Sequence, residues 1–248
     1  MKIPRTQKGF TLKGFIFKGV AFKGFTLIEL LVVIGIIALL ASIAVPAFTG
    51  VQVRAAQTKA MSNAKQIGLA CKQFAIDNNG AYPTYQWSTT GTSTTPAPTS
   101  TDAFNNLFPG YLTTISLFYV PKSAFTLGNQ PSDPSQQTMS STGAIATGQN
   151  EWAYVTGLYD TSNAAFPLIA DGFASLSTHA YSTSETAKGG VWKGLNAIVV
   201  FADDSAKVMK CNPTSLQVPG SPNNTDLFDT TQGTNGWLAA TNSVVNPL

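Results

Sequence analysis

The sequence predicts an α+β fold in which a long N-terminal helix packs on a C-terminal antiparallel β-sheet. Three observations predict it. Residues 25–45 form an apolar run with a single charge, and residues 53–74 place apolar side chains at every third or fourth position. Residues 152–209 contain short β-branched and aromatic runs separated by turn residues. We therefore expect a helix that is first transmembrane and then amphipathic, followed by a sheet from the second half of the chain.

The apolar run from Phe25 to Val45 is long enough to cross a membrane. Its 21 residues span roughly 31 Å as a helix, at about 1.5 Å per residue, which matches the hydrocarbon core of a bilayer. Glu29 lies inside this run, and a carboxylate at the bilayer centre costs on the order of 2.5–3.5 kcal/mol on insertion scales. We therefore expect Glu29 to have a partner or a function.

The junction in front of this run resembles a known processing site. Residues 23–29, KGFTLIE, are similar to the cleavage segment of type IV pilins and of type II secretion pseudopilins. The resemblance implies that a prepilin peptidase cuts after Gly24 and methylates the new amino terminus at Phe25. It also makes Glu29 the fifth mature residue and gives Pro46 the place of the helix proline of the family. An ordinary anchor or an uncleaved signal peptide would explain the apolar run alone.

Residues 1–24, the predicted leader, determine the charge balance and the topology. They hold six basic residues and no acid: Lys2, Arg5, Lys8, Lys13, Lys18 and Lys23. By the positive-inside rule the leader stays cytoplasmic, which predicts a single pass through the inner membrane and an extracytoplasmic globular domain. Removing these six charges from the net charge of +3 leaves the mature chain near −3, so we predict no nucleic-acid partner.

The rest of the chain divides into three predicted parts. Residues 25–46 form the transmembrane and assembly helix, residues 47–80 continue it as an amphipathic helix, and residues 81–248 form the globular domain. The amphipathic stripe comprises Val53, Ala56, Ala60, Ala64, Ile67, Cys71 and Phe74. Pro46 is expected to kink or loosen the helix, and the sequence DNNG at 77–80 to end it. Residues 74–84 resemble the corresponding pseudopilin junction.

Within the globular domain, two segments rich in Ser, Thr and Pro, 88–101 and 128–150, predict exposed loops. Runs at 152–158, 166–172 and 196–201 predict strands, and 206–209 completes a hairpin with its turn at Asp203 and Asp204. This succession resembles the C-terminal half of the large pilin-like proteins of planctomycete and verrucomicrobial lineages. Those proteins usually have Asp-Gly in the last turn, so the turn type is left open.

No catalytic site can be assembled from the sequence, and we predict that the protein is not an enzyme. A triad of His179, Asp171 and a serine can be drawn, but serine is abundant and a turn histidine is the preferred interpretation. No cofactor is predicted apart from one calcium alternative. Asp226 and Asp229 lie among oxygen-bearing residues of the kind calcium prefers, although such loops more often form turns.

The two cysteines leave two alternatives open. Cys71 lies on the stripe that should face the sheet, and Cys211 follows the last strand by two residues. Disulfides persist outside the cytoplasm, where this domain is predicted to lie. Either Cys71 and Cys211 are bonded, or they are two buried thiols that never meet.

The resemblance implies a structural subunit of a type IV pilus or type II secretion filament. Its partners would be the prepilin peptidase, other pilin or pseudopilin subunits and the inner membrane. The filament would then lie in the periplasm or at the cell surface. The alternative function is a membrane-anchored extracytoplasmic module that binds DNA or glycans.

Overall fold

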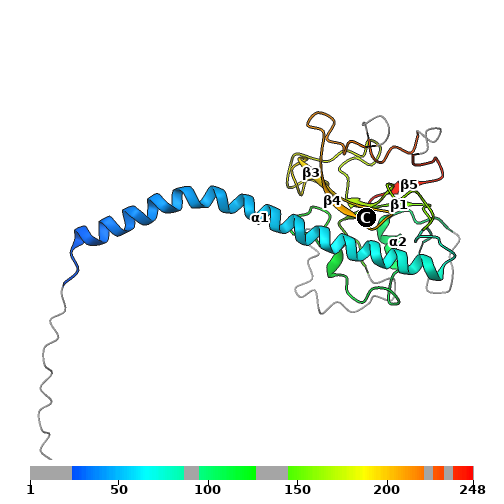
Figure 1. Cartoon of the computed structure of the whole chain (residues 1–248), viewed down its shortest axis with the longest axis horizontal. Helices are drawn as coiled ribbons and strands as arrows, with labels where there is room; N and C mark the ends of the chain where they lie inside the picture. The colour runs from blue at the N-terminus through cyan, green and yellow to red at the C-terminus, as the bar shows by residue number, and fades with distance from the viewer. Residues whose placement is uncertain (1–23, 87–94, 127–144, 221–225, 232–236, 248) are drawn as a thin grey trace, which may run out of the picture. The chain divides into compact units, whose positions relative to one another are not determined.

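The computed structural model describes residues 24–86, 95–126, 145–220, 226–231 and 237–247 (Figure 1). The predicted leader up to residue 23 lies outside them. The chain forms two compact units, Met1–Gly50 and Val51–Leu248, and the first helix contributes to both. The elements in chain order are α1 (Leu27–Asp77), α2 (Ser100–Asn105), the 3-10 helix η1 (Ser116–Phe118), β1 (Trp152–Thr156), β2 (Pro167–Asp171), β3 (Asn196–Phe201), β4 (Ala206–Lys210) and β5 (Ser243–Val245). The predicted α+β class is confirmed.

The sheet is antiparallel, with five strands in the order β4-β3-β2-β1-β5. The four predicted strands are present, whereas the three-residue strand β5 was not predicted. The predicted hairpin joins β3 to β4, with Asn196 opposite Lys210. In its turn, the Phe201 amide donates to the Ser205 carbonyl at 2.9 Å, and Asp204 has a φ of +68°. Aspartate tolerates this left-handed conformation better than most residues, so the turn forms without glycine.

The second half of α1 packs on this sheet through small side chains. A Cβ added at Gly68 would lie 3.0 Å from Val200 Cγ1 and 4.0 Å from Ile169 Cδ1, which shows how closely the helix backbone approaches β3 and β2. The buried residues of this helix face are Gln57, Ala60, Ala64, Ile67, Gly68, Ala70, Cys71 and Ala75. Val53, predicted to start the stripe, is 50% exposed, so the face begins later than expected. Figure 1 shows this part of α1 running beside the strands.

The helix α1 ends where the sequence predicts, at Asp77. Asn79 and Gly80 have φ of +55° and +81°. The Gly80 amide donates to the Ala75 carbonyl at 2.8 Å, which is the outer hydrogen bond of a Schellman motif. Proline lacks the amide hydrogen that a helix interior uses, yet α1 continues through residue 46, so the helix is not broken there.

The prediction of an exposed loop at 88–101 is partly wrong. Residues 87–94 lie outside the described residues, but Ser100 and Thr101 are buried in the first turn of α2. The Ser100 hydroxyl donates to the Trp152 carbonyl at 2.6 Å, and the Asn150 amide donates to Ser100 and Thr101. Asn150 itself is buried at the end of the second predicted loop. Hydrogen bonds compensate for the burial of these polar side chains, a possibility that the composition of the loops does not reveal.

Candidate functional site at the helix N-terminus

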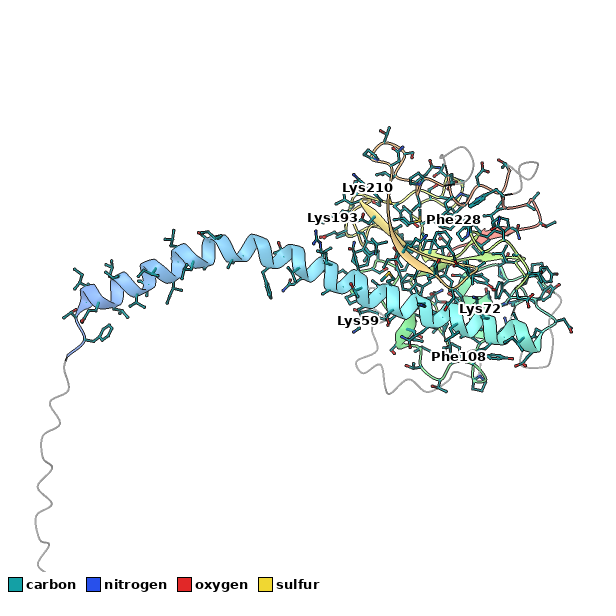
Figure 2. All side chains as sticks on the ribbon, in the orientation of Figure 1. Lys59, Lys72, Phe108, Lys193, Lys210 and Phe228 are labelled. Atoms are coloured by element: carbon teal, nitrogen blue, oxygen red, sulfur yellow. The ribbon has the colours of Figure 1, made fainter. Side chains whose placement is uncertain are left out.

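The first half of α1 presents an apolar surface made of exposed side chains. Every residue from Gly24 to Val45 is exposed, including Ile36 and Leu39 at 53% and 65%. Figure 2 shows the side chains of this segment projecting from the helix. In the described part of the chain, α1 is the one helix that is long and apolar enough to cross a membrane, judged by length and composition. A continuous apolar surface of this size needs a lipid or protein environment.

Glu29 and Thr26 cap the N-terminus of this helix with a reciprocal pair of hydrogen bonds. The Thr26 amide donates to Glu29 Oε2 at 2.9 Å, and the Glu29 amide donates to Thr26 Oγ1 at 3.3 Å. The Thr26 hydroxyl also donates to Glu29 Oε2, at 2.6 Å. This is a capping box, in which the first and fourth residues of the motif satisfy amides that the helix leaves free. The carboxylate also lies at the positive end of the helix dipole.

Sequence reasoning missed this capping role, although its signal is visible. Thr26 and Glu29 have the Thr-x-x-Glu spacing that defines the motif, directly before an apolar run. Glu29 was expected to require a partner or a function inside the membrane. The structure supplies one partner within the same chain, and because both contacts use Oε2 on an exposed residue, the carboxylate stays accessible.

Comparison with protein families matches this same segment. Residues 21–45 match the model of the prokaryotic N-terminal methylation motif. The chain carries the N-terminal motif of type IV pilins and pseudopilins. The match therefore supports the resemblance to pilins and pseudopilins seen at residues 23–29. The exposed apolar helix also fits a pilin-like or pseudopilin subunit anchored in a membrane. Such proteins form a structural family whose members are typically not enzymes. Neither the curated proteins nor the solved structures contain a match to the chain.

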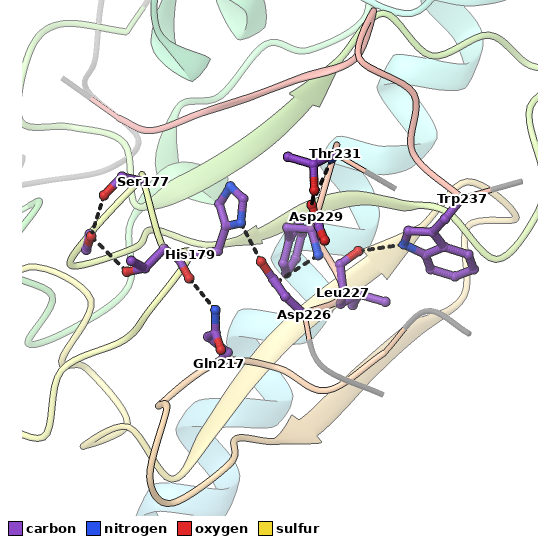
Figure 3. Close-up of polar contacts among 11 residues, drawn as sticks. Ser177, His179, Gln217, Asp226, Leu227, Asp229, Thr231 and Trp237 are labelled. Atoms are coloured by element: carbon purple, nitrogen blue, oxygen red, sulfur yellow. Dashed lines mark hydrogen bonds and ion pairs between the residues drawn. The ribbon is translucent and has the colours of Figure 1, made fainter. Parts of the chain in front are cut away.

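In the globular domain, His179 forms a pair with Asp226 (Figure 3). The distance from His179 Nδ1 to Asp226 Oδ2 is 2.7 Å, and the two side chains are 14% and 12% exposed. The imidazole also contacts Phe173 and Phe228, at centroid distances of 5.5 and 6.1 Å. His179 has a φ of +50°, so the preferred interpretation as a turn histidine agrees with its backbone. The His179–Asp226 pair joins the loop after β2 to the segment that follows β4.

The hydrolytic triad considered for His179 is not formed, because Asp171 binds elsewhere. Asp171 Oδ2 accepts hydrogen bonds from Trp192 Nε1 at 2.9 Å and from the Ile198 amide at 2.6 Å. The carboxylate that contacts His179 is Asp226, whose other oxygen accepts from the Phe228 amide at 3.0 Å. A buried acid that binds the amide of a neighbouring strand and the indole of the turn before that strand has a structural role.

The two residues of the calcium alternative are engaged in local contacts. Asp226 binds His179 and the Phe228 amide, and Asp229 Oδ1 accepts from the Thr231 amide at 2.8 Å and its hydroxyl at 2.6 Å. Figure 3 shows the two acids on one short segment. Among the described residues, no group of three or more His, Cys, Asp or Glu side chains could hold a metal ion. The neighbouring residues 221–225 lie outside the described part, and calcium binding stays a prediction.

Cys71 and Cys211 are free thiols in the structure, and both are buried. A disulfide between them is not formed, because the two residues lie near opposite ends of the β3–β4 hairpin. Cys71 lies one turn after Gly68, whose Cβ position is 3.1 Å from Asp204 in the β3–β4 turn. Cys211 follows the opposite end of the hairpin, where its amide donates to the Leu195 carbonyl at 3.0 Å. Burial, together with the negative charge of Asp171, raises the pKa of Cys211 to about 12.

Proposed function

We propose that the mature chain is a structural subunit of a type IV pilus or type II secretion filament, assembled through the first half of α1. One observation carries the proposal: the segment that matches the methylation motif is also an apolar helix whose side chains are exposed on every side. Such a helix is stable in a bilayer as a monomer and in the centre of a filament as one of many copies. Hydrophobic surface that is exposed in the subunit becomes buried in the assembly.

Processing after Gly24 by a prepilin peptidase fits the surroundings of the junction. Gly24 has no other atoms within 4 Å of its Cβ position, and Phe25 is 71% exposed. A peptidase would therefore reach the bond between them without unfolding the helix. Cleavage leaves the amino group of Phe25 one residue before Thr26, which caps the helix.

The partners and location follow from the same model. The subunit waits in the inner membrane with its N-terminus cytoplasmic and its domain extracytoplasmic, and it then joins other pilin or pseudopilin subunits. Residues 25–46 supply the assembly helix, and residues 47–80 carry it into the globular domain at 81–248. We predict no nucleic-acid partner for this subunit, because the net charge near −3 of the mature chain gives no argument for one.

Glu29 has two tasks in this model. Within its own chain it completes the capping box, and in the filament it pairs with the methylated amino terminus of a neighbouring subunit. A buried ion pair of this kind sets register more than it adds stability. The contact would compensate a carboxylate that is costly in lipid without a partner.

Two substitutions at Glu29 separate these tasks. Glu29→Gln keeps a side chain that can cap the helix but removes the charge, whereas Glu29→Val removes both. When co-expressed with wild-type subunits, both variants should insert in the membrane and both should be depleted from filaments. Thr26→Val is the matched control, because it weakens the cap and leaves the charge. Wild-type incorporation of Glu29→Gln would refute the pairing, and would leave capping as the only task.

The proposal as a whole is tested on native filaments. Filaments isolated from the producing cell should contain this chain in many copies, and its intact mass should correspond to a methylated chain that begins at Phe25. A chain that begins at Met1, Phe10 or Phe15 would refute processing after Gly24. A membrane pool that never enters filaments but retains DNA or glycans would favour the alternative, an anchored binding module.

A further inference from the structure

Two acidic residues, Glu151 and Asp171, are fully buried where β1 begins and β2 ends, at one end of the sheet. Asp171 ends β2 opposite Trp152, and Glu151 directly precedes that residue. The Gly172 amide donates to the Glu151 carbonyl at 2.9 Å, which joins the two segments next to the acids. Both residues are 0% exposed. Buried carboxylates are costly unless their charge is compensated.

One oxygen of each acid has partners and the other has none. Glu151 Oε2 accepts from the Ser123 hydroxyl, and Asp171 Oδ2 accepts from Trp192 and from the Ile198 amide. Glu151 Oε1 and Asp171 Oδ1 are buried without a hydrogen-bond partner. Ionisation leaves such an oxygen charged, buried and without a donor, so this environment favours the neutral, protonated form of the acid.

The groups that surround the pair do not supply a positive charge. Within the described residues the ion pairs are His179–Asp226 and Lys193–Glu185, so neither buried acid has a basic partner. Tyr181 donates to the Asp171 carbonyl at 3.3 Å, and Cys211 lies close enough to be affected by the charge of Asp171. Lys188 lies over the Phe125 ring instead, with Nζ 4.9 Å from its centroid.

The tyrosine and the cysteine stay neutral near pH 7. Burial raises the pKa of Tyr181 well above its usual value, and the negative charges of nearby acids, with Asp171 the largest, raise it further. The pKa of Cys211 is likewise raised. Asp226 is itself paired with His179, and its charge adds to the negative potential around Tyr181.

We propose that Glu151 and Asp171 together retain at least one proton at neutral pH, and that loss of this proton destabilises the globular domain. The pair then acts as a pH-sensitive clamp. It ties together the loop at Ser123, the adjoining ends of β1 and β2, and the start of β3 with Trp192. Ionisation of both acids places two negative charges inside the core, and neither has a basic partner among the described residues.

The direction of the pH effect follows from the raised pKa values. Burial raises the pKa of Glu151 well above its usual value, and the charge of Asp171 raises it further. Burial raises the pKa of Asp171 to about 7, despite the opposing hydrogen bonds from Ile198 and Trp192. The unfolded chain ionises both acids near pH 4, so the folded state holds more protons above that pH. Stability is therefore greatest below about pH 4 for this pair and falls as the pH rises through 7.

The test uses the full-length protein in detergent micelles, unfolded with urea at pH 5 to 8 and followed by tryptophan fluorescence. Each retained proton should change the unfolding equilibrium constant about tenfold per pH unit. Glu151→Gln is neutral at every pH, so it should remove at least one such factor from the pH dependence and stabilise the domain at pH 8. Asp171→Asn should act in the same direction. Glu185→Gln, on the surface, is the matched control and should leave the pH dependence unchanged.

The opposite results are equally clear. An identical pH dependence in wild type and Glu151→Gln, or a wild-type stability that rises with pH, would overturn the proposal. So would stabilisation by calcium chloride that Glu151→Gln abolishes, because the pair would then hold a cation. If the variants do not fold, infrared spectroscopy of the wild type decides. A protonated carboxyl band that persists above pH 6 supports the retained proton, and its absence overturns the proposal.

Discussion

The two halves of α1 belong to one continuous helix and yet bury their apolar side chains in different ways. Residues 51–77 bury one face against the sheet of the same chain, with Ala64 and Ile67 at 0% exposure. Residues 27–45 are exposed on all sides although they are more apolar. The side chains of the first half are exposed, so its apolar surface is available to lipid or to other subunits. One element thus serves both folding and assembly.

Side-chain size differs between the halves for the same reason. The second half places Ala60, Ala64, Gly68 and Cys71 against the sheet, and these small residues allow the helix backbone to approach β2 and β3 closely. The first half consists mainly of Leu, Ile and Val. Large aliphatic side chains suit a lipid or intersubunit environment, in which no sheet dictates the distance of approach.

The largest expected difference between the halves concerns isoleucine truncation. Ile67→Ala should lower the free energy of unfolding of the domain by about 2–5 kcal/mol, because it opens a cavity in the core. Ile36→Ala is the matched control, since Ile36 is 53% exposed and contributes nothing to the domain core. Urea unfolding in detergent measures both. Equal effects at the two positions would contradict the division of the helix.

A second contrast uses glycine. Gly68→Leu would force a side chain against Val200 and Asp204, 3.0 and 3.1 Å from the added Cβ, and should cost about 1–3 kcal/mol. Gly35→Leu has no atoms within 4 Å of its Cβ and should leave the stability of the domain unchanged. Thermal unfolding of the two variants makes the comparison. A tolerated leucine at Gly68 would mean that helix and sheet are less closely packed than described.

The smallest expected effect concerns the reactivity of the two cysteines, which tests only the half of α1 that packs on the sheet. We expect the denatured, unreduced protein to react with two equivalents of a thiol reagent, because Cys71 and Cys211 lie at opposite ends of the β3–β4 hairpin. The native protein should react slowly, since both thiols are buried and protonated thiols are poor nucleophiles. A denatured chain without reactive thiols would instead demonstrate the bridge.

The sequence predicted the parts of this fold that depend on periodicity and on turn residues. The helix end at Asp77, the four longer strands and the hairpin at Asp203 and Asp204 were all predicted, because each has a local signal. The short strand β5 was missed, since three residues carry little pattern. Val53 was placed on the buried face because periodicity does not show where a helix first meets its sheet.

The long-range polar contacts could not be predicted from the sequence. Nothing local indicates that Ser100 is buried under the Trp152 carbonyl, or that Asp171 binds Trp192 rather than His179. The pairing of His179 with Asp226 likewise depends on how two distant loops meet. The capping role of Glu29 differs from these contacts, because its spacing from Thr26 is a local signal that predicts a capping box. The prediction for Glu29 relied only on its position in the membrane.

The most direct test of the division of α1 is photo-crosslinking from its first half. A photoreactive phenylalanine at Leu39, which is 65% exposed, would be introduced into subunits that assemble into filaments. We predict crosslinks between two copies of the chain in isolated filaments, mapped to residues 25–50 of the second copy, and crosslinks to lipid in the unassembled membrane pool. Filaments in which Leu39 crosslinks to no other subunit would contradict assembly through this helix.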